Sequence, residues 1–98
     1  MGELDPHVTP PARLKLLVTL TGVSEAEFAT VRDALDVSDS VLSKHLAALE
    51  DAGYLTRRKG MHRGHRTTWI SLTPGGRRAL DSHIEALRAL IDGVGSAR

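Results

Sequence analysis

The residue types best suited to chemistry in this sequence are cations that share one acid-free window. Residues 52–80 contain seven Lys and Arg residues and no Asp or Glu, although the formal net charge of the whole chain is only +1. Residues 1–51 carry nine acids against four Lys and Arg, so the two signs of charge are segregated. Such a window predicts a surface that binds a polyanion, and the alternative is a solvated basic face.

A second group of candidates lies where a helix is expected, over residues 38–52. Ser38 has the N-cap residue type, and Asp39 suits the positive end of a helix dipole. A leucine stripe at helical spacing predicts the buried side, formed by Leu42, Leu46 and Leu49. Ser40, Lys44 and Ala47 are expected on the opposite side, with Ser43 on one flank and Val41, His45 and Ala52 on the other flank. This outward face is short and polar, so it can approach another surface closely.

Other combinations of residues argue against catalysis and metal binding. His62 and His65 stand among cations that would repel a metal ion, so we interpret them as further anion contacts. The chain has no cysteine, which excludes disulfides and thiolate metal sites. No nucleophile adjoins a candidate base, and no glycine-rich phosphate loop follows a strand. We therefore expect no enzyme activity, no metal and no cofactor.

Length and composition indicate the class of protein that carries these residues. Ninety-eight residues, 41% hydrophobic and 26% charged, are typical of one globular domain over residues 1–98. No apolar run reaches the ~20 residues that span a bilayer, and the N-terminus lacks a signal-peptide pattern. The sequence thus predicts a cytoplasmic protein with no membrane partner.

The elements expected along the chain place both groups. Residues 1–10 are expected to form a flexible arm. A first helix begins at Pro10-Pro11 and ends at Gly22, and Thr30 is a candidate cap for a brief second helix. After the helix over 38–52, the residue pattern changes from a helical period to the alternation of strands. Strands are expected at 54–59 and 66–72, joined by a tip at 60–65. A last helix is expected over 74–92.

The last helix carries its own apolar stripe at seven-residue spacing. The stripe consists of Leu80, Ile84, Leu87 and Ile91. It either covers the core or forms a dimer seam, and its length and terminal position favour the dimer seam.

This order of elements, mainly α with a small β-hairpin (α+β), is that of a winged helix-turn-helix. The segment from Val37 to Leu55 resembles the recognition-helix signature of bacterial MarR- and ArsR-like transcriptional regulators. Pro11-Ala12-Arg13-Leu14 resembles their first-helix motif, and Ile70-Ser71-Leu72-Thr73 with Gly76 is similar to the end of the MarR-like wing. The resemblance covers roughly residues 10–92 and is specific over residues 37–55.

The resemblance implies a repressor that binds double-stranded DNA as a homodimer through a C-terminal dimerisation helix. The operator is expected to be an inverted repeat, with the recognition helices in successive major grooves and the wings on flanking DNA. Ser38, Asp39, Ser40, Ser43, Lys44 and His45 are the expected contacts on the recognition helix. The expected wing contacts over residues 54–72 are Arg57, Arg58, Lys59, Arg63, His65 and Arg66.

Several of these residues have a second interpretation. Ser38 is a helix cap as well as a candidate ligand, and Asp39 either orients backbone N–H groups or repels wrong sequences. His45 is equally well explained as a half-buried packing residue. Arg57 and Arg58 point to opposite faces of their strand, so only one of them is expected to face DNA. Trp69 is expected to pack against the first or last helix.

Two alternatives concern the function of the whole protein. A winged-helix protein-interaction module would expose apolar anchors on the recognition helix, and a sequence-independent architectural binder would not need its serines. MarR-like relatives often bind an effector, which leaves an unidentified small-molecule partner open. Asp81-Ser82-His83 resembles half of an ArsR-like zinc site, but Val94 and Ala97 stand where its other ligands would be.

Overall fold

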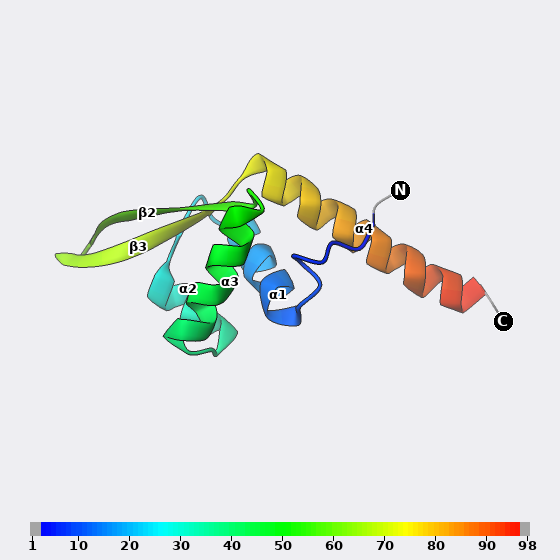
Figure 1. Cartoon of the computed structure of the whole chain (residues 1–98), viewed down its shortest axis with the longest axis horizontal. Helices are drawn as coiled ribbons and strands as arrows, with labels where there is room; N and C mark the ends of the chain where they lie inside the picture. The colour runs from blue at the N-terminus through cyan, green and yellow to red at the C-terminus, as the bar shows by residue number, and fades with distance from the viewer. Residues whose placement is uncertain (1–2, 97–98) are drawn as a thin grey trace.

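The computed structural model describes residues 3–96, which form a helical body with a small antiparallel sheet (Figure 1). The molecule measures 58 × 25 × 22 Å, because the β2–β3 hairpin and the end of α4 project from opposite sides of the body. The sheet has the strand order β1-β3-β2. The elements are α1 (Pro11–Thr21), β1 (Ala26–Glu27), α2 (Phe28–Leu35), α3 (Asp39–Asp51), β2 (Leu55–His62), β3 (His65–Leu72) and α4 (Pro74–Ser96).

The core lies between the first three helices, the base of the sheet and the first turns of α4. Aliphatic side chains supply nearly all of it, as the low aromatic content requires. The stripe predicted for α3 is buried as expected. The buried apolar residues that form one connected cluster are Val8, Leu16, Leu17, Leu20, Val31, Leu35, Leu42, Leu46, Leu49, Leu55, Ile70 and Leu80.

A tight turn joins α2 to α3 and sets their angle. Asp36 follows α2 in the left-handed region with φ 54°, and its N–H returns to the carbonyl oxygen of Asp33. Ser38 then caps α3, with the Val41 N–H donating to its Oγ at 3.2 Å. The predicted cap of α3 is confirmed. The predicted cap of α2 at Thr30 is wrong, because α2 already begins at Phe28.

The hairpin is longer and its turn shorter than the sequence predicted. β2 and β3 pair from Leu55↔Leu72 out to His62↔His65. Only Arg63 and Gly64 lie in the turn, with φ of 51° and 81°, and positive φ at both central residues suits the twist of a two-residue hairpin. A third strand, β1, adds to the β3 edge and was not predicted, because two residues show no periodicity.

The start of α4 is tied to the end of α3. Thr73 caps the helix as predicted, accepting from the Gly76 N–H at 2.9 Å, and its own hydroxyl donates to the carbonyl oxygen of Gly53. A Cβ on Gly76 would lie 2.0 Å from the carbonyl oxygen of Tyr54, so only glycine allows this approach. α4 continues to Ser96, past the predicted end at 92.

The N-terminal segment is packed against the body, so the expected flexible arm is wrong for its described part. The side chain of Val8 is fully buried. The Asp5 N–H donates to Nδ1 of the buried His83 at 2.9 Å, and the Tyr54 hydroxyl donates to an Asp5 carboxylate oxygen. The segment therefore connects the end of α3 to α4.

Candidate nucleic-acid interface

The outward face of α3 is small, polar and exposed. Ser40, Ser43, Lys44 and Ala47 are all exposed, and the leucine stripe covers the opposite side of the helix. The side chain of Lys44 forms no ion pair or hydrogen bond within residues 3–96. This face meets the steric requirement of a helix that enters a groove.

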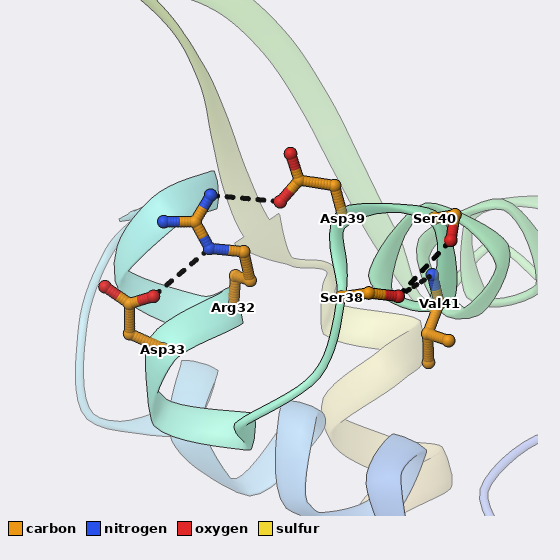
Figure 2. A network of polar contacts seen from close by, with 6 residues as sticks. All are labelled: Arg32, Asp33, Ser38, Asp39, Ser40 and Val41. Atoms are coloured by element: carbon orange, nitrogen blue, oxygen red, sulfur yellow. Dashed lines mark hydrogen bonds and ion pairs between the residues drawn. The ribbon is translucent and has the colours of Figure 1, made fainter.

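Side chains at the start of α3 are already engaged with one another (Figure 2). The Oγ atoms of Ser38 and Ser40 are 3.2 Å apart, and Ser38 also accepts from the helix backbone. Both interpretations of Ser38 remain compatible with this geometry, because the capping hydroxyl is also exposed. The cap role is the one that the hydrogen bond demonstrates.

Asp39 is paired with a cation from the preceding helix. The Arg32 guanidinium donates to Asp39 Oδ1 through Nη1 at 3.0 Å and to Asp33 Oδ1 through Nε at 3.1 Å (Figure 2). These bonds, that to Asp39 first, raise the pKa of Arg32 above its usual value. Arg32 thus offsets part of the negative charge that Asp39 places at the start of α3.

His45 lies on the flank of α3, half-buried beside α1. Its Nδ1 accepts a hydrogen bond from the Nε–H of Arg13 at 3.0 Å. Burial, and then the positive charge of Arg13, lower the pKa of His45 below its usual value. The lowered pKa and the lone pair that Nδ1 presents to Arg13 both favour the neutral form of His45, and α1 holds its ring in place.

Both strand arginines of the wing are held by acids, which the charge pattern did not predict. Arg57 donates to Glu50 at the end of α3, with 2.7 Å between Nη2 and Oε1. Arg58 forms two hydrogen bonds with Glu25, one of them 3.0 Å from Nε to Oε2. The two arginines leave their strand on opposite faces, as expected, but each is anchored to the body.

Trp69 belongs to the wing rather than to the helical packing expected for it. The Arg58 guanidinium carbon lies 5.7 Å from the centroid of its ring, and the ring of His62 meets it edge-on at 5.5 Å. Cation–π contacts of this kind are attractive even between side chains that stay partly exposed to solvent. The outer face of the hairpin is thereby a packed cluster.

The remaining wing cations have no partner in the part of the chain that the structure describes. They are exposed, and neither an ion pair nor a hydrogen bond engages their side chains: Lys59, Arg63, His65 and Arg66. Lys59 pairs across the ladder with Thr68, and Arg66 pairs with Met61. Because side chains alternate along strands, these two cations share the face of Leu55 and Ile70, which is the face toward the helices. They line a hollow of about 420 Å³ there.

The apolar stripe of α4 divides into two parts. Leu80 is buried in the protein's own core and Ile84 packs against that core, so the prediction of Leu80 as an interface residue is wrong. Farther along the helix, Leu87 is half-buried. The exposed apolar residues of this end are Leu90, Ile91 and Val94, at 54%, 69% and 73% exposure.

His83 has a structural role. It is 2% exposed and accepts from the backbone of Asp5, which explains the histidine of the zinc-like Asp81-Ser82-His83 motif without a metal. Among residues 3–96 no three His, Asp or Glu side chains gather as metal ligands would. No helix in that range is long and apolar enough to cross a membrane.

Two side-chain pairs of the candidate site were not predictable from the sequence. Arg13 stands in the recognised first-helix motif, but nothing in its spacing points to His45, 32 residues away. Arg32 precedes Asp39 by seven residues across a turn, so no helical period relates them.

A helix-turn-helix whose second helix shows a polar outward face, followed by a basic hairpin, defines the class of winged-helix DNA-binding proteins. The family model described as winged helix DNA-binding domain matches residues 12–91. The chain belongs to this family, and the predicted winged-helix fold is confirmed.

Similar proteins agree with this assignment. The chain is 33% identical over 72 residues to the uncharacterized protein MJ0432 of Methanocaldococcus jannaschii, covering 74% of this chain and 78% of that protein. It superposes on a transcriptional regulator homologue from Pyrococcus horikoshii with a TM-score of 0.83 and 25% identity, covering 90% and 87% of the two chains. It also superposes on a MarR-family transcriptional regulator from Silicibacter pomeroyi with a TM-score of 0.67 and 26% identity, covering 85% of this chain but only 55% of that one. The protein is a winged-helix transcriptional regulator.

Proposed function

We propose that this protein is a sequence-specific repressor that binds an inverted-repeat operator as a homodimer. One observation carries the proposal. The exposed polar face of α3 and the unpaired wing cations Lys59 and Arg66 are both on the helix side of the hairpin, which supports contact of a single duplex with both. An interaction module would instead offer aromatic or aliphatic anchors on α3.

In this proposal α3 lies in the major groove. Ser40, Ser43 and Lys44 approach base edges or adjacent phosphates, because the buried leucines direct them outward. Hydroxyl groups donate and accept, so serines suit several bases. Ser38 and Asp39 stay at the helix start, where Arg32 removes the repulsion between Asp39 and the phosphates.

The wing supplies affinity that is mostly independent of sequence. Lys59 and Arg66 neutralise phosphates, His65 is a further contact near the end of the hairpin, and Arg63 at the turn reaches farthest along the duplex. The paired arginines have a different task. Arg57 and Arg58 fix the hairpin to α3 and to the β1 segment through Glu50 and Glu25.

Homodimerisation supplies the two-fold symmetry that an inverted repeat demands. The occupant that we propose for the apolar end of α4 is the same end of a second copy. Leu87, Leu90, Ile91 and Val94 leave one end of a long helix without a covering layer, and Figure 1 shows that this end projects away from the body. Two recognition helices would then enter successive major grooves about 34 Å apart.

Repression needs no surface beyond these. A dimer bound over a promoter blocks other proteins by occupancy alone. A small-molecule effector stays a prediction, and the place that would suit one is a hollow of about 410 Å³ between the N-terminal segment and α4, bordered by Leu4, His7 and Tyr54.

Selection from a library of randomised duplexes tests the proposal. The expected product is an inverted repeat whose half-site centres are about one helical turn apart. Enrichment of single half-sites would contradict the dimer. Recovery of unselected sequence despite binding would instead indicate an architectural DNA binder.

A further inference from the structure

Arg13 and His45 make a contact that extends the recognition surface from α3 onto α1. The Nε–H of Arg13 donates to Nδ1 of His45 at 3.0 Å, and both side chains are half-buried. The N-terminal turn of α1 is therefore fixed against the middle of α3. Neither the buried leucine stripe of α3 nor its N-cap depends on this bond.

The bond determines which nitrogen of His45 carries the proton. A guanidinium can only donate, so Nδ1 must present its lone pair. The proton of the neutral ring is then on Nε2, and Nε2–H is a donor. Within residues 3–96 no acceptor engages that donor. A helix that is expected to contact DNA thus holds a fixed, unused hydrogen-bond donor.

His45 lies on a flank of α3 that, in the proposed complex, faces the wall of the major groove. Val41 and His45 lie one turn apart on one flank of α3, beside the outward face formed by Ser40 and Lys44. A helix with its side chains is about 10–12 Å across and the major groove is about 12 Å wide, so the flanks of the helix face base edges and sugar-phosphate walls.

We propose that His45 reads one base pair in each half-site through Nε2–H, and that Arg13 is the positioning residue that orients it. The preferred partner is guanine, whose N7 and O6 both accept hydrogen bonds in the major groove. This inference rests on the proposed function, because it assigns one position of the operator to one side chain.

A neutral side chain that hydrogen-bonds to a base differs from a cation that contacts a phosphate in how its loss changes the salt dependence of binding. Burial and the charge of Arg13 disfavour protonation of His45, so His45 neutralises no phosphate and releases no counterion. Loss of His45 must therefore change sequence preference and leave the salt dependence alone. Loss of Lys59 must reduce the salt dependence and leave the sequence preference unchanged.

Library selection with variants tests this division. His45→Ala is expected to lose about tenfold discrimination at one position in each half-site while the other positions keep theirs. Arg13→Gln and Arg13→Lys are expected to weaken the same position. His45→Gln is expected to shift it toward adenine, the base that glutamine pairs with through N6 and N7. Lys15→Gln, at an exposed residue of α1, is the matched control for Arg13→Gln and is expected to leave every position of the selected sequence unchanged.

The outcomes separate this inference from the proposed function. If the wild-type protein enriches no sequence, the proposed function and the assigned reader both fail. If it enriches an inverted repeat and His45→Ala selects the identical one, only the inference is overturned. Long-range ¹H–¹⁵N correlation spectra of the free wild-type protein give a second check. They are expected to show His45 protonated at Nε2, and protonation at Nδ1 would overturn the role of Arg13.

Discussion

Arg32 on α2 and Asp39 on α3 are joined across the tight turn, with 3.0 Å between Nη1 and Oδ1. The pair lies on the surface beside the turn that sets the angle between the two helices. It also places a guanidinium beside the only acid of the first turn of that helix. A surface pair of this kind contributes little to stability, so we expect its importance to lie in binding.

We therefore predict that Arg32→Gln weakens DNA binding by about three- to tenfold and barely changes the thermal midpoint. The reason is that Asp39 then faces the phosphates uncompensated. The double variant Arg32→Gln/Asp39→Asn is expected to recover most of the loss in fluorescence anisotropy titrations. If it binds as weakly as Arg32→Gln, the proposed compensation is wrong.

Removal of the free wing cations is expected to weaken binding to every duplex. Arg63→Gln/Arg66→Gln removes two phosphate contacts, so the slope of log affinity against log salt should flatten by about 0.9 per contact. Titrations at four salt concentrations measure it. Arg88→Gln, which neutralises an exposed arginine of α4 away from the wing, is the control. An equal flattening in the control would refute the assignment of the face.

Changes on the outward face of α3 should affect discrimination instead. Ser43→Ala/Lys44→Gln removes groups that face base edges, so the gap between the selected duplex and a scrambled one should shrink by about 1–3 kcal/mol per lost base contact. Competition titrations measure that gap. An unchanged gap would show that α3 is not the reading helix.

Charges on the exposed end of α4 should prevent dimerisation. Leu87→Glu/Ile91→Glu buries two carboxylates in the proposed seam, so sedimentation velocity is expected to give monomers where the wild type gives dimers. Val23→Glu, at an exposed valine before β1, is the matched control and should stay dimeric. A dimeric double variant would rule out this seam.

The Tyr54–Asp5 bond predicts a loss of stability in alkali. Hydrogen bonding to Asp5, then burial and the charge of Asp5, raise the pKa of Tyr54 to about 12. The unfolded chain releases this proton near pH 10, so unfolding is favoured as pH rises from about 10 to about 12. Urea unfolding should show a loss of about 1 kcal/mol in the wild type over that range beyond any loss in Tyr54→Phe. Parallel curves for the two proteins would show that the bond is not formed.

Local signals in the sequence predicted the helices around the site. Ser38 and Thr73 cap their helices because capping depends on neighbouring residues, and the spacing of Leu42, Leu46 and Leu49 orients α3 without help from the rest of the chain. Pairings between distant segments were not predictable. Arg58 meets Glu25 across 33 residues, and nothing in either segment indicates the other.

Periodicity also cannot show where a core ends. Leu80 and Ile91 belong to one stripe, yet the first is 2% exposed and the second 69%, because α4 leaves the body between them. The same limit applies to the N-terminal segment. Val8 joins a core cluster made of residues distant in the sequence, and Asp5 is held by His83 of α4 and by Tyr54, so this packing exists only after folding.

Fluorescence anisotropy on the gene's own upstream duplex and on a scrambled duplex measures whether this face binds DNA specifically. Both are titrated at several salt concentrations. We expect tight, salt-sensitive binding to the upstream duplex, with the scrambled duplex weaker by ~10³ or more. Equal affinity for the two duplexes, with the library-selected sequence no better, would contradict it.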